Sequence, residues 1–415
     1  MTKKSIAIVC NILRPVIGVS AITLLTVLAG VEVRAAEWRI EPALRVAAEF
    51  DDNADLSIFT DEEQDISGYV ADVSARFAYT SPVTSFFATP RFVSRNYGEE
   101  DFDSDDQFLR ANFRRDFRSS MFGIGFNYGR ELARTGERAD AADLEVEDPD
   151  DIPVDDSGRV FIRGRRERIE VAPRYSFSLS EKSSLGIGVR HTDTSYDEEL
   201  SGILNDYTDT SSNLTYRRAW SSRNTAIVMG TYREYESDCP TCFDKSTGYG
   251  LSFGYESRLS ETTTLSAVVG AENTELESGI EEVNPIVNVS LSRRMKTINL
   301  FAQYRRVISG GGGGSLASRD IINLNFRRQL NDRMTAGLGV RAYSTNALKE
   351  GPVTFDERDY VQLRALFIWK LNETVSFDVE YRYTIINRER LGESANSNNV
   401  LLWLSWRPIP IVRSR

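Results

Sequence analysis

The sequence of 415 residues is poor in the residues on which many catalytic and metal sites depend. It has one histidine and three cysteines. One histidine argues against a histidine-based metal centre, and three cysteines cannot form a disulfide scaffold. The chain is not basic either, since 61 acidic and 50 basic residues give a net charge of −11. This balance argues against bulk nucleic-acid binding, and no motif suggests a cofactor.

Long hydrophobic runs are absent after the first 35 residues. That segment begins with Lys3 and Lys4, continues with an apolar stretch over residues 16–31, and ends in small residues around Ala35. A positive start, an apolar centre and a small-residue end predict a signal peptide of residues 1–35, cleaved after Ala35. The alternative is a membrane anchor, but the apolar run is shorter than the ~20 residues of a spanning helix.

The rest of the chain is rich in aromatic residues, with 17 tyrosines and 21 phenylalanines, and repeats one pattern. Eight times an aromatic or apolar strand end is followed by a short polar turn and a new alternating strand, as in residues 177–185 and 326–335. Eight turns predict sixteen strands, to which residues 38–50 and 399–406 add two. Short turns that alternate with longer polar segments are typical of a transmembrane β-barrel.

Alternation of side chains supports this interpretation. Val375, Phe377 and Val379 fall on one face of a strand, whereas Asp378, Glu380 and Arg382 fall on the other. A soluble all-β protein would bury the apolar face, but strands of 10–14 residues fit the 9–11 residues of a tilted membrane span. We therefore predict an all-β, antiparallel up-and-down barrel of about 18 strands over residues 36–407, with a short tail at 408–415.

This barrel is expected in the outer membrane of a Gram-negative bacterium, with short turns in the periplasm and loops outside. Its expected contacts are membrane lipid, lipopolysaccharide and the barrel assembly machinery. Eighteen strands enclose an aqueous channel unless something fills it.

Two segments resemble the β-barrel porins associated with exopolysaccharide and capsule secretion. Residues 42–53 form an apolar strand that ends in Phe-Asp-Asp-Asn, and residues 327–335 read Arg-Arg-Gln-Leu-Asn-Asp-Arg-Met-Thr. The resemblance implies a barrel that helps a polysaccharide leave the cell together with a periplasmic polysaccharide export protein. It implies no catalytic residue.

The negative charge is unevenly placed. Residues 49–65, 98–106 and 137–156 together hold 24 acidic residues and one basic residue. Without these segments and the signal peptide, 36 acidic and 45 basic residues remain, so the body of the barrel is net positive. The alternation points eleven charged candidates into the lumen: Arg76, Arg110, Arg114, Arg190, Arg305, Arg327, Arg341, Arg364, Arg382, Asp378 and Glu380.

Arginines in a pore favour anions, which suggests a conduit for an anionic polymer or a small anionic solute. The alternative is that these arginines pair with acids such as Asp72, Asp378 and Glu380 and only brace the barrel wall. Passive diffusion of small solutes is the second functional hypothesis, and residues 135–158 are the only segment long enough for a constriction loop.

The acidic segments fit solvated loops or divalent-cation bridges to lipopolysaccharide. Asp51, Asn53, Asp55 and Glu62 have the spacing of a calcium loop, without its glycine and flanking helices, and form a weak candidate metal site. Cys239 and Cys242 lie in an outer loop, where a local disulfide is more plausible than a redox motif, since the strand–helix context is missing.

The features expected of an enzyme are weak. His191 shares the parity of apolar neighbours, so we expect it to face the outer lipid interface, and it has no readable serine or acid partner. Residues 310–314 are five glycines that read as a flexible outer loop. We therefore predict that the protein is not an enzyme.

Overall fold

The computed structural model describes residues 36–57, 63–98, 101–133, 164–197, 204–239, 245–276, 279–312, 314, 316–348, 358–388 and 393–414. The predicted signal peptide lies outside these ranges. Nineteen strands follow one another along the described chain: β1 (Glu37–Asp51), β2 (Ile66–Thr80), β3 (Thr84–Asn96), β4 (Ser104–Asp116), β5 (Ser120–Leu132), β6 (Arg165–Ser180), β7 (Ser183–Tyr196), β8 (Tyr207–Ala219), β9 (Asn224–Ser237), β10 (Lys245–Arg258), β11 (Thr263–Leu276), β12 (Glu281–Arg294), β13 (Ile298–Gly310), β14 (Leu316–Gln329), β15 (Met334–Ala347), β16 (Arg358–Lys370), β17 (Val375–Arg388), β18 (Glu393–Trp406) and β19 (Ile411–Ser414).

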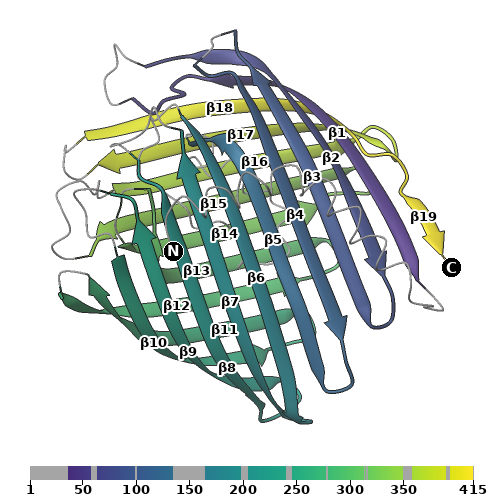
Figure 1. Ribbon diagram of the computed structural model, residues 1–415. Helices are drawn as coiled ribbons and strands as arrows, with labels where there is room; N and C mark the ends of the chain where they lie inside the picture. Colours follow the sequence, from purple (N-terminus) through teal and green to yellow (C-terminus); the bar gives the residue numbers. More distant parts are fainter. Residues whose placement is uncertain are drawn as a thin grey trace, which may run out of the picture.

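The strands form one closed antiparallel barrel (Figure 1). Each strand from β1 to β18 pairs with the next along the chain, and β1 pairs with β18 to close the ring. The predicted all-β, up-and-down barrel of 18 strands is therefore confirmed. The chain enters and leaves the barrel on the side of the short turns. Glu37, where β1 begins, pairs with Thr80, which lies just before the first turn.

The barrel closes through two consecutive pieces of chain, which we call the closing seam. Residues 44–51 of β1 pair with residues 399–406 of β18, and residues 37–40 pair with β19. Four residues, 407–410, lie opposite only three of β1, and Pro408 and Pro410 interrupt the strand there. Part of the segment expected as a tail, residues 408–415, thus adds a short strand to β1, beside which it lies in Figure 1.

The two faces of the barrel differ in chemistry because successive side chains of a strand point to opposite faces. Large apolar side chains are exposed along the outward face, among them Leu251, Phe253 and Leu338. Charged outward-facing residues lie only near the strand ends, as Arg328 does beside its turn. Such a continuous exposed apolar belt suits lipid and would be unfavourable in water. Among the described residues, no helix is long and apolar enough to cross a membrane.

Six of the eight short turns are held by local hydrogen bonds from main-chain N–H groups to polar side chains. Asn331 Oδ1 accepts the N–H groups of Arg333 and Met334 at 2.9 and 2.8 Å. Asn372 Oδ1 accepts the N–H groups of Thr374 and Val375, both at 2.8 Å. Such side-chain turns form without long-range contacts, which explains why the sequence shows them clearly.

Aromatic pairs surround the barrel near these turns. Trp38 and Tyr79 lie with ring centroids 4.8 Å apart, and Trp220 and Tyr255 lie 6.4 Å apart. Amphipathic rings favour the boundary between lipid and water, so these pairs mark the periplasmic edge of the apolar belt.

Candidate functional site: the arginine-lined interior

The inward face of the barrel carries the charged residues. Paired residues of neighbouring strands point to the same face of the barrel. The register therefore assigns the residues of each strand in turn to the inward or the outward face. It places the following predicted residues on the inward face: Arg76, Arg110, Arg114, Arg190, Arg305, Arg327, Arg341, Arg364, Arg382, Asp378 and Glu380. Their part in conduction stays a prediction.

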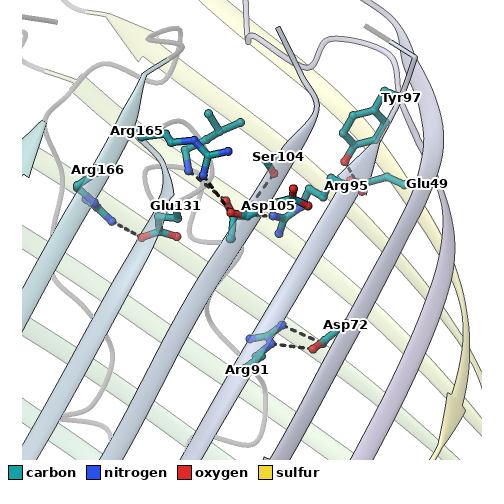
Figure 2. A network of polar contacts seen from close by, with 12 residues as sticks. Glu49, Asp72, Arg91, Arg95, Tyr97, Ser104, Asp105, Glu131, Arg165 and Arg166 are labelled. Atoms are coloured by element: carbon teal, nitrogen blue, oxygen red, sulfur yellow. Dashed lines mark hydrogen bonds and ion pairs between the residues drawn. The ribbon is translucent and has the colours of Figure 1, made fainter. Parts of the chain in front are cut away.

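Asp72 of β2 is shared by two arginines of the inward face. Arg91 of β3 forms a two-pronged ion pair with it, with both N–O distances at 3.0 Å (Figure 2). Arg45 of β1 lies 3.8 Å away. Arg45 also lies over the Trp403 ring at 4.3 Å. The carboxylate is buried, so this group braces the closing seam, yet its two cations and one anion leave a net positive charge.

Glu380 of β17 is also shared by two arginines of the inward face. Arg364 Nε of β16 lies 2.5 Å from Glu380 Oε1, and Arg382 Nε lies 2.6 Å from the same atom. Glu380 is 1% exposed. Asp378, two residues earlier, accepts a hydrogen bond from Ser405 and makes no ion pair within the described part of the chain.

A third carboxylate, Glu170 of β6, is also shared. Arg168 lies 3.3 Å from Glu170 Oε2, and Arg190 of β7 lies 3.9 Å from Oε1. Nearer the outer rim, Glu131 pairs with Arg166 at 2.7 Å (Figure 2). Asp106 pairs with Arg95 at the same level. The groups at Asp72, Glu170 and Glu380 hold two arginines each.

Several inward-facing arginines, among them Arg76, Arg174 and Arg327, have no carboxylate partner in the ranges that the structure covers. Arg76 lies over the Phe87 ring at 4.8 Å. Arg76, Arg110 and Arg174 are solvent-exposed although they point inward, so water reaches this part of the interior. The bracing hypothesis thus holds for some predicted arginines, such as Arg364 and Arg382, and not for all.

A second feature of the interior is the upper part of the β13–β14 hairpin, of which residues 307–312, 314 and 316 are described and which we call the hairpin tip. Pairing of β12 with β13 stops at Val287 and Arg306, although β13 and β14 stay paired as far as Gly310 and Leu316. Above this point the hairpin leaves the wall. Pro285, which has no N–H to donate, lies in the part of β12 that β13 does not cover.

The hairpin tip packs against the inner wall of β8 and β9. Ile308 and Leu316 are each 2% exposed and form one apolar cluster with Tyr207, Tyr235 and Leu348. Tyr207 and Tyr235 are inward-facing residues of β8 and β9. The five-glycine segment, of which Gly310, Gly311, Gly312 and Gly314 are described, was expected to be a flexible outer loop, and this expectation is wrong for the described glycines at positions 310–312.

Main-chain carbonyls of the hairpin tip accept hydrogen bonds from the wall. The Tyr235 hydroxyl donates to Gly311 O at 2.9 Å, the Asn205 N–H donates to Gly312 O at 2.9 Å, and Arg233 donates to Ile308 O. Asp206, next to Asn205 in the loop before β8, has its pKa raised by burial and by the Asp238 and Asp193 carboxylates, against the hydrogen bond from the Tyr196 N–H.

The candidate calcium residues have a different role. Asp51 Oδ1 accepts hydrogen bonds from the Asn53 N–H at 3.0 Å and from Ser397 Oγ at 2.7 Å. Asn53 binds Ser57 through both ends of its amide and donates to Asn396 O at 3.0 Å. No group of three or more acidic, histidine or cysteine residues in the described chain could hold a metal, and Glu62 lies outside it. These side chains fasten the first outer loop to β18.

The remaining sequence candidates lie outside the arginine groups. Cys239 is buried and disulfide-bonded, whereas Cys242 lies outside the described residues, so the Cys239–Cys242 pairing stays a prediction. His191 is on the outward face of β7, and its Nδ1 lies 2.8 Å from the Thr210 hydroxyl of β8. Residues 134–163, with the predicted constriction loop, also lie outside the described residues.

Comparison with known proteins shows likeness in structure and not in sequence. The chain is similar to OccAB4 of Acinetobacter baumannii, with a TM-score of 0.47 and 9% identity over 91% of this chain and 99% of that one. It is also similar to a BenF-like porin from Pseudomonas fluorescens, with a TM-score of 0.49 and 9% identity over 89% and 99% of the chains. The outer membrane channel DcaP of Acinetobacter baumannii gives a TM-score of 0.44 and 11% identity over 90% and 97%. No family model and no curated protein matches the chain.

The protein is an outer-membrane β-barrel of a Gram-negative bacterium. The architecture of the chain supports this conclusion. It is a closed ring of an even number of antiparallel strands with an uncharged outward belt, and the chain enters and leaves the ring on the side of the short turns. A closed ring satisfies the main-chain hydrogen bonds inside lipid, which an open sheet cannot do.

Sequence reasoning missed several inward arginines that matter here, Arg174 among them. Arg45 and Arg91 share Asp72, and Arg233 holds the hairpin tip. Leu44 and Val46 are exposed on the outward face, so alternation along the strand was enough to predict that Arg45 faces inward. No comparable sequence signal links Arg233 to Ile308, because 75 residues separate them.

Proposed function

We propose that the protein is a passive diffusion channel that favours small anionic solutes. The observation that supports it best is the charge of the interior: Asp72, Glu170 and Glu380 are each shared by two arginines, and further arginines have no acidic partner among the described residues. A net positive lining inside a low-dielectric wall attracts anions and repels cations.

The free arginines carry the selectivity in this proposal. An arginine that shares a buried carboxylate is fixed by it, and its charge is partly cancelled. Arg76 and Arg174 are exposed to water and have no acidic partner within the described strands and loops, so a passing anion can replace the water around them. We expect an anion to interact with each of them briefly as it crosses the barrel.

Export of an exopolysaccharide, with a periplasmic export protein as partner, was the first hypothesis from the sequence. The Phe-Asp-Asp-Asn segment that carries part of that resemblance binds β18 and the first outer loop. These contacts explain the segment as a structural part of the barrel and do not require a bound polymer. Deletion of the gene followed by measurement of secreted polysaccharide tests the hypothesis, and reduced secretion would restore it over passive diffusion.

Reversal potentials test the proposed function. The purified protein in a planar bilayer under a tenfold KCl gradient is expected to give the sign of an anion-selective channel. Arg76→Glu, Arg174→Glu and Arg327→Glu, combined, should move the potential towards cation selectivity. Arg328→Glu is the matched control, because Arg328 is the neighbour of Arg327 and points outward. A cation-selective or non-conducting wild-type protein would overturn the proposal.

A further inference from the structure

We propose that the hairpin tip, residues 307–312, 314 and 316, is the constriction that sets the size limit for solutes. The proposal rests on the proposed diffusion channel and names the element that decides which solutes fit. An inner-wall hairpin is unexpected from the sequence, because the glycine segment reads as an outer loop and the candidate constriction was residues 135–158.

The position of the hairpin tip is the first support. β13 leaves β12 above Arg306, and the side of the hairpin that would otherwise face outward, with Ile308 and Leu316, packs on the inner faces of Tyr207 and Tyr235. Three strands, β10, β11 and β12, separate β9 from β13 along the ring. A segment that crosses from β13 to β9 inside the barrel occupies part of its cross-section. Solutes must pass through the remaining part.

Three anchors fix the hairpin tip, and each one holds a main-chain carbonyl. Tyr235 binds Gly311 O, Asn205 binds Gly312 O, and Arg233 binds Ile308 O. Arg233 lies 3.4 Å from Asp209 and 3.6 Å from Glu272, so two carboxylates offset its charge. Arg233 is therefore a positioning residue for the hairpin tip and not part of the anion-attracting lining.

The close approach explains why glycine occupies the hairpin tip. A Cβ atom at Gly310 would lie 2.4 and 2.5 Å from two ring carbons of Tyr235, and one at Gly312 would lie 2.5 Å from the Tyr196 hydroxyl oxygen. Contacts of this length are not tolerated, so a larger residue at position 310 must push the hairpin tip away from β9. Gly310 and Gly312 thus allow the hairpin tip to pack closely against the inner wall, whereas the sequence pattern alone suggested a mobile loop.

Gly310→Val tests the constriction directly. Displacement of the hairpin tip should raise the single-channel conductance roughly twofold or more and should admit larger polyethylene glycols than the wild type admits. Gly230→Val is the matched control, because an added Cβ there meets no atom within 4 Å. Unchanged conductance and an unchanged polymer cut-off in folded Gly310→Val would overturn the proposal.

A second pair of variants covers the case in which Gly310→Val does not fold, as judged by heat-modifiable migration on a gel. Tyr235→Ala removes the inward ring and hydroxyl that hold the hairpin tip, and should also raise conductance and the polymer cut-off. Tyr232→Ala removes an outward tyrosine of the same strand and should not. Equal conductance in both variants would count against the constriction.

The same bilayers separate this proposal from the proposed function. Reversal potential reports on the arginine lining, and conductance with polymer exclusion reports on the hairpin tip. A wild-type channel without anion preference whose conductance still rises in Gly310→Val would remove the proposed selectivity and keep the constriction. An anion-selective channel with no response to Gly310→Val or Tyr235→Ala would do the reverse.

Discussion

The hydroxyl of Ser397 donates a hydrogen bond of 2.7 Å to Asp51 Oδ1, across 346 positions of sequence. The two residues come from the last and first long strands, where the barrel closes. Asn398 makes two further bonds of 2.7 Å to the neighbouring Asp52, one through its main-chain N–H and one through its side chain. The acidic end of β1 is therefore a polar fastening for the closing seam, at the outer rim where no lipid competes.

Asp51→Ala should weaken this fastening. It removes the acceptor of buried donors from Asn53, Ser397 and Asn399, and each unsatisfied buried donor costs about 1–3 kcal/mol. We expect a lower urea midpoint for unfolding from lipid vesicles, followed by tryptophan fluorescence. Asp332→Ala, in an exposed periplasmic turn, is the control and should leave the midpoint where it is. Equal midpoints for both variants would show that the fastening contributes nothing.

Glu380→Gln should change selectivity and stability together. Loss of the carboxylate leaves Arg364 and Arg382 without their shared acid, which strengthens the positive lining, and breaking a buried ion pair costs about 3–5 kcal/mol. We expect greater anion selectivity in reversal potentials and a lower unfolding midpoint. Glu373→Gln, in a periplasmic turn, should change neither quantity. Lower anion selectivity in Glu380→Gln would contradict the assignment of these arginines to the lining.

The apolar belt predicts a depth-dependent cost for charge. Leu338 and Leu330 are similarly exposed, at 60% and 50%, but Leu338 lies within β15 whereas Leu330 lies in the turn before it. Leu338→Arg should lower the unfolding free energy in vesicles by about 2–4 kcal/mol and Leu330→Arg by about 0–1 kcal/mol, as expected for the membrane centre and interface. Equal costs at the two sites would contradict the placement of the belt.

The disulfide of Cys239 gives a prediction for the outer loop between β9 and β10. If Cys242 is the partner, intact mass after iodoacetamide treatment of the cleaved protein should show no alkylation until a reductant is added, and two alkylated thiols afterwards. Cys242→Ser should expose one reactive thiol without any change in conductance. Alkylation of the untreated wild-type protein would contradict the pairing.

Local rules decided how much of the fold the sequence could predict. Alternation along residues such as Val375, Phe377 and Val379 needs only the geometry of a strand, and the turns at Asn331 and Asn372 need only their own side chains. Strand number and direction follow from counting these turns. The face of each arginine follows from parity, although its ion-pair partner does not.

The hairpin tip and the Asp51 segment show where local rules fail. Five glycines indicate mobility unless the ring of Tyr235, 75 positions earlier than Gly310, is known to lie against them. Asp51, Asn53 and Asp55 match a calcium spacing. The oxygen atoms of Asp51 and Asn53, however, accept hydrogen bonds from main-chain and side-chain donors of the first loop and of β18. Both errors come from contacts between distant parts of the chain.

Closure of the ring by residues 399–414 also fixes the order of assembly. One edge of β1 has its partners in β18 and β19, which follow every other strand along the chain, so it stays open until all the earlier strands have been made and exported. An open strand edge attracts other chains, which makes the unfinished barrel prone to aggregate in the periplasm. Chaperones that hold the nascent chain, and rapid insertion once β18 and β19 arrive, are therefore requirements set by the topology itself.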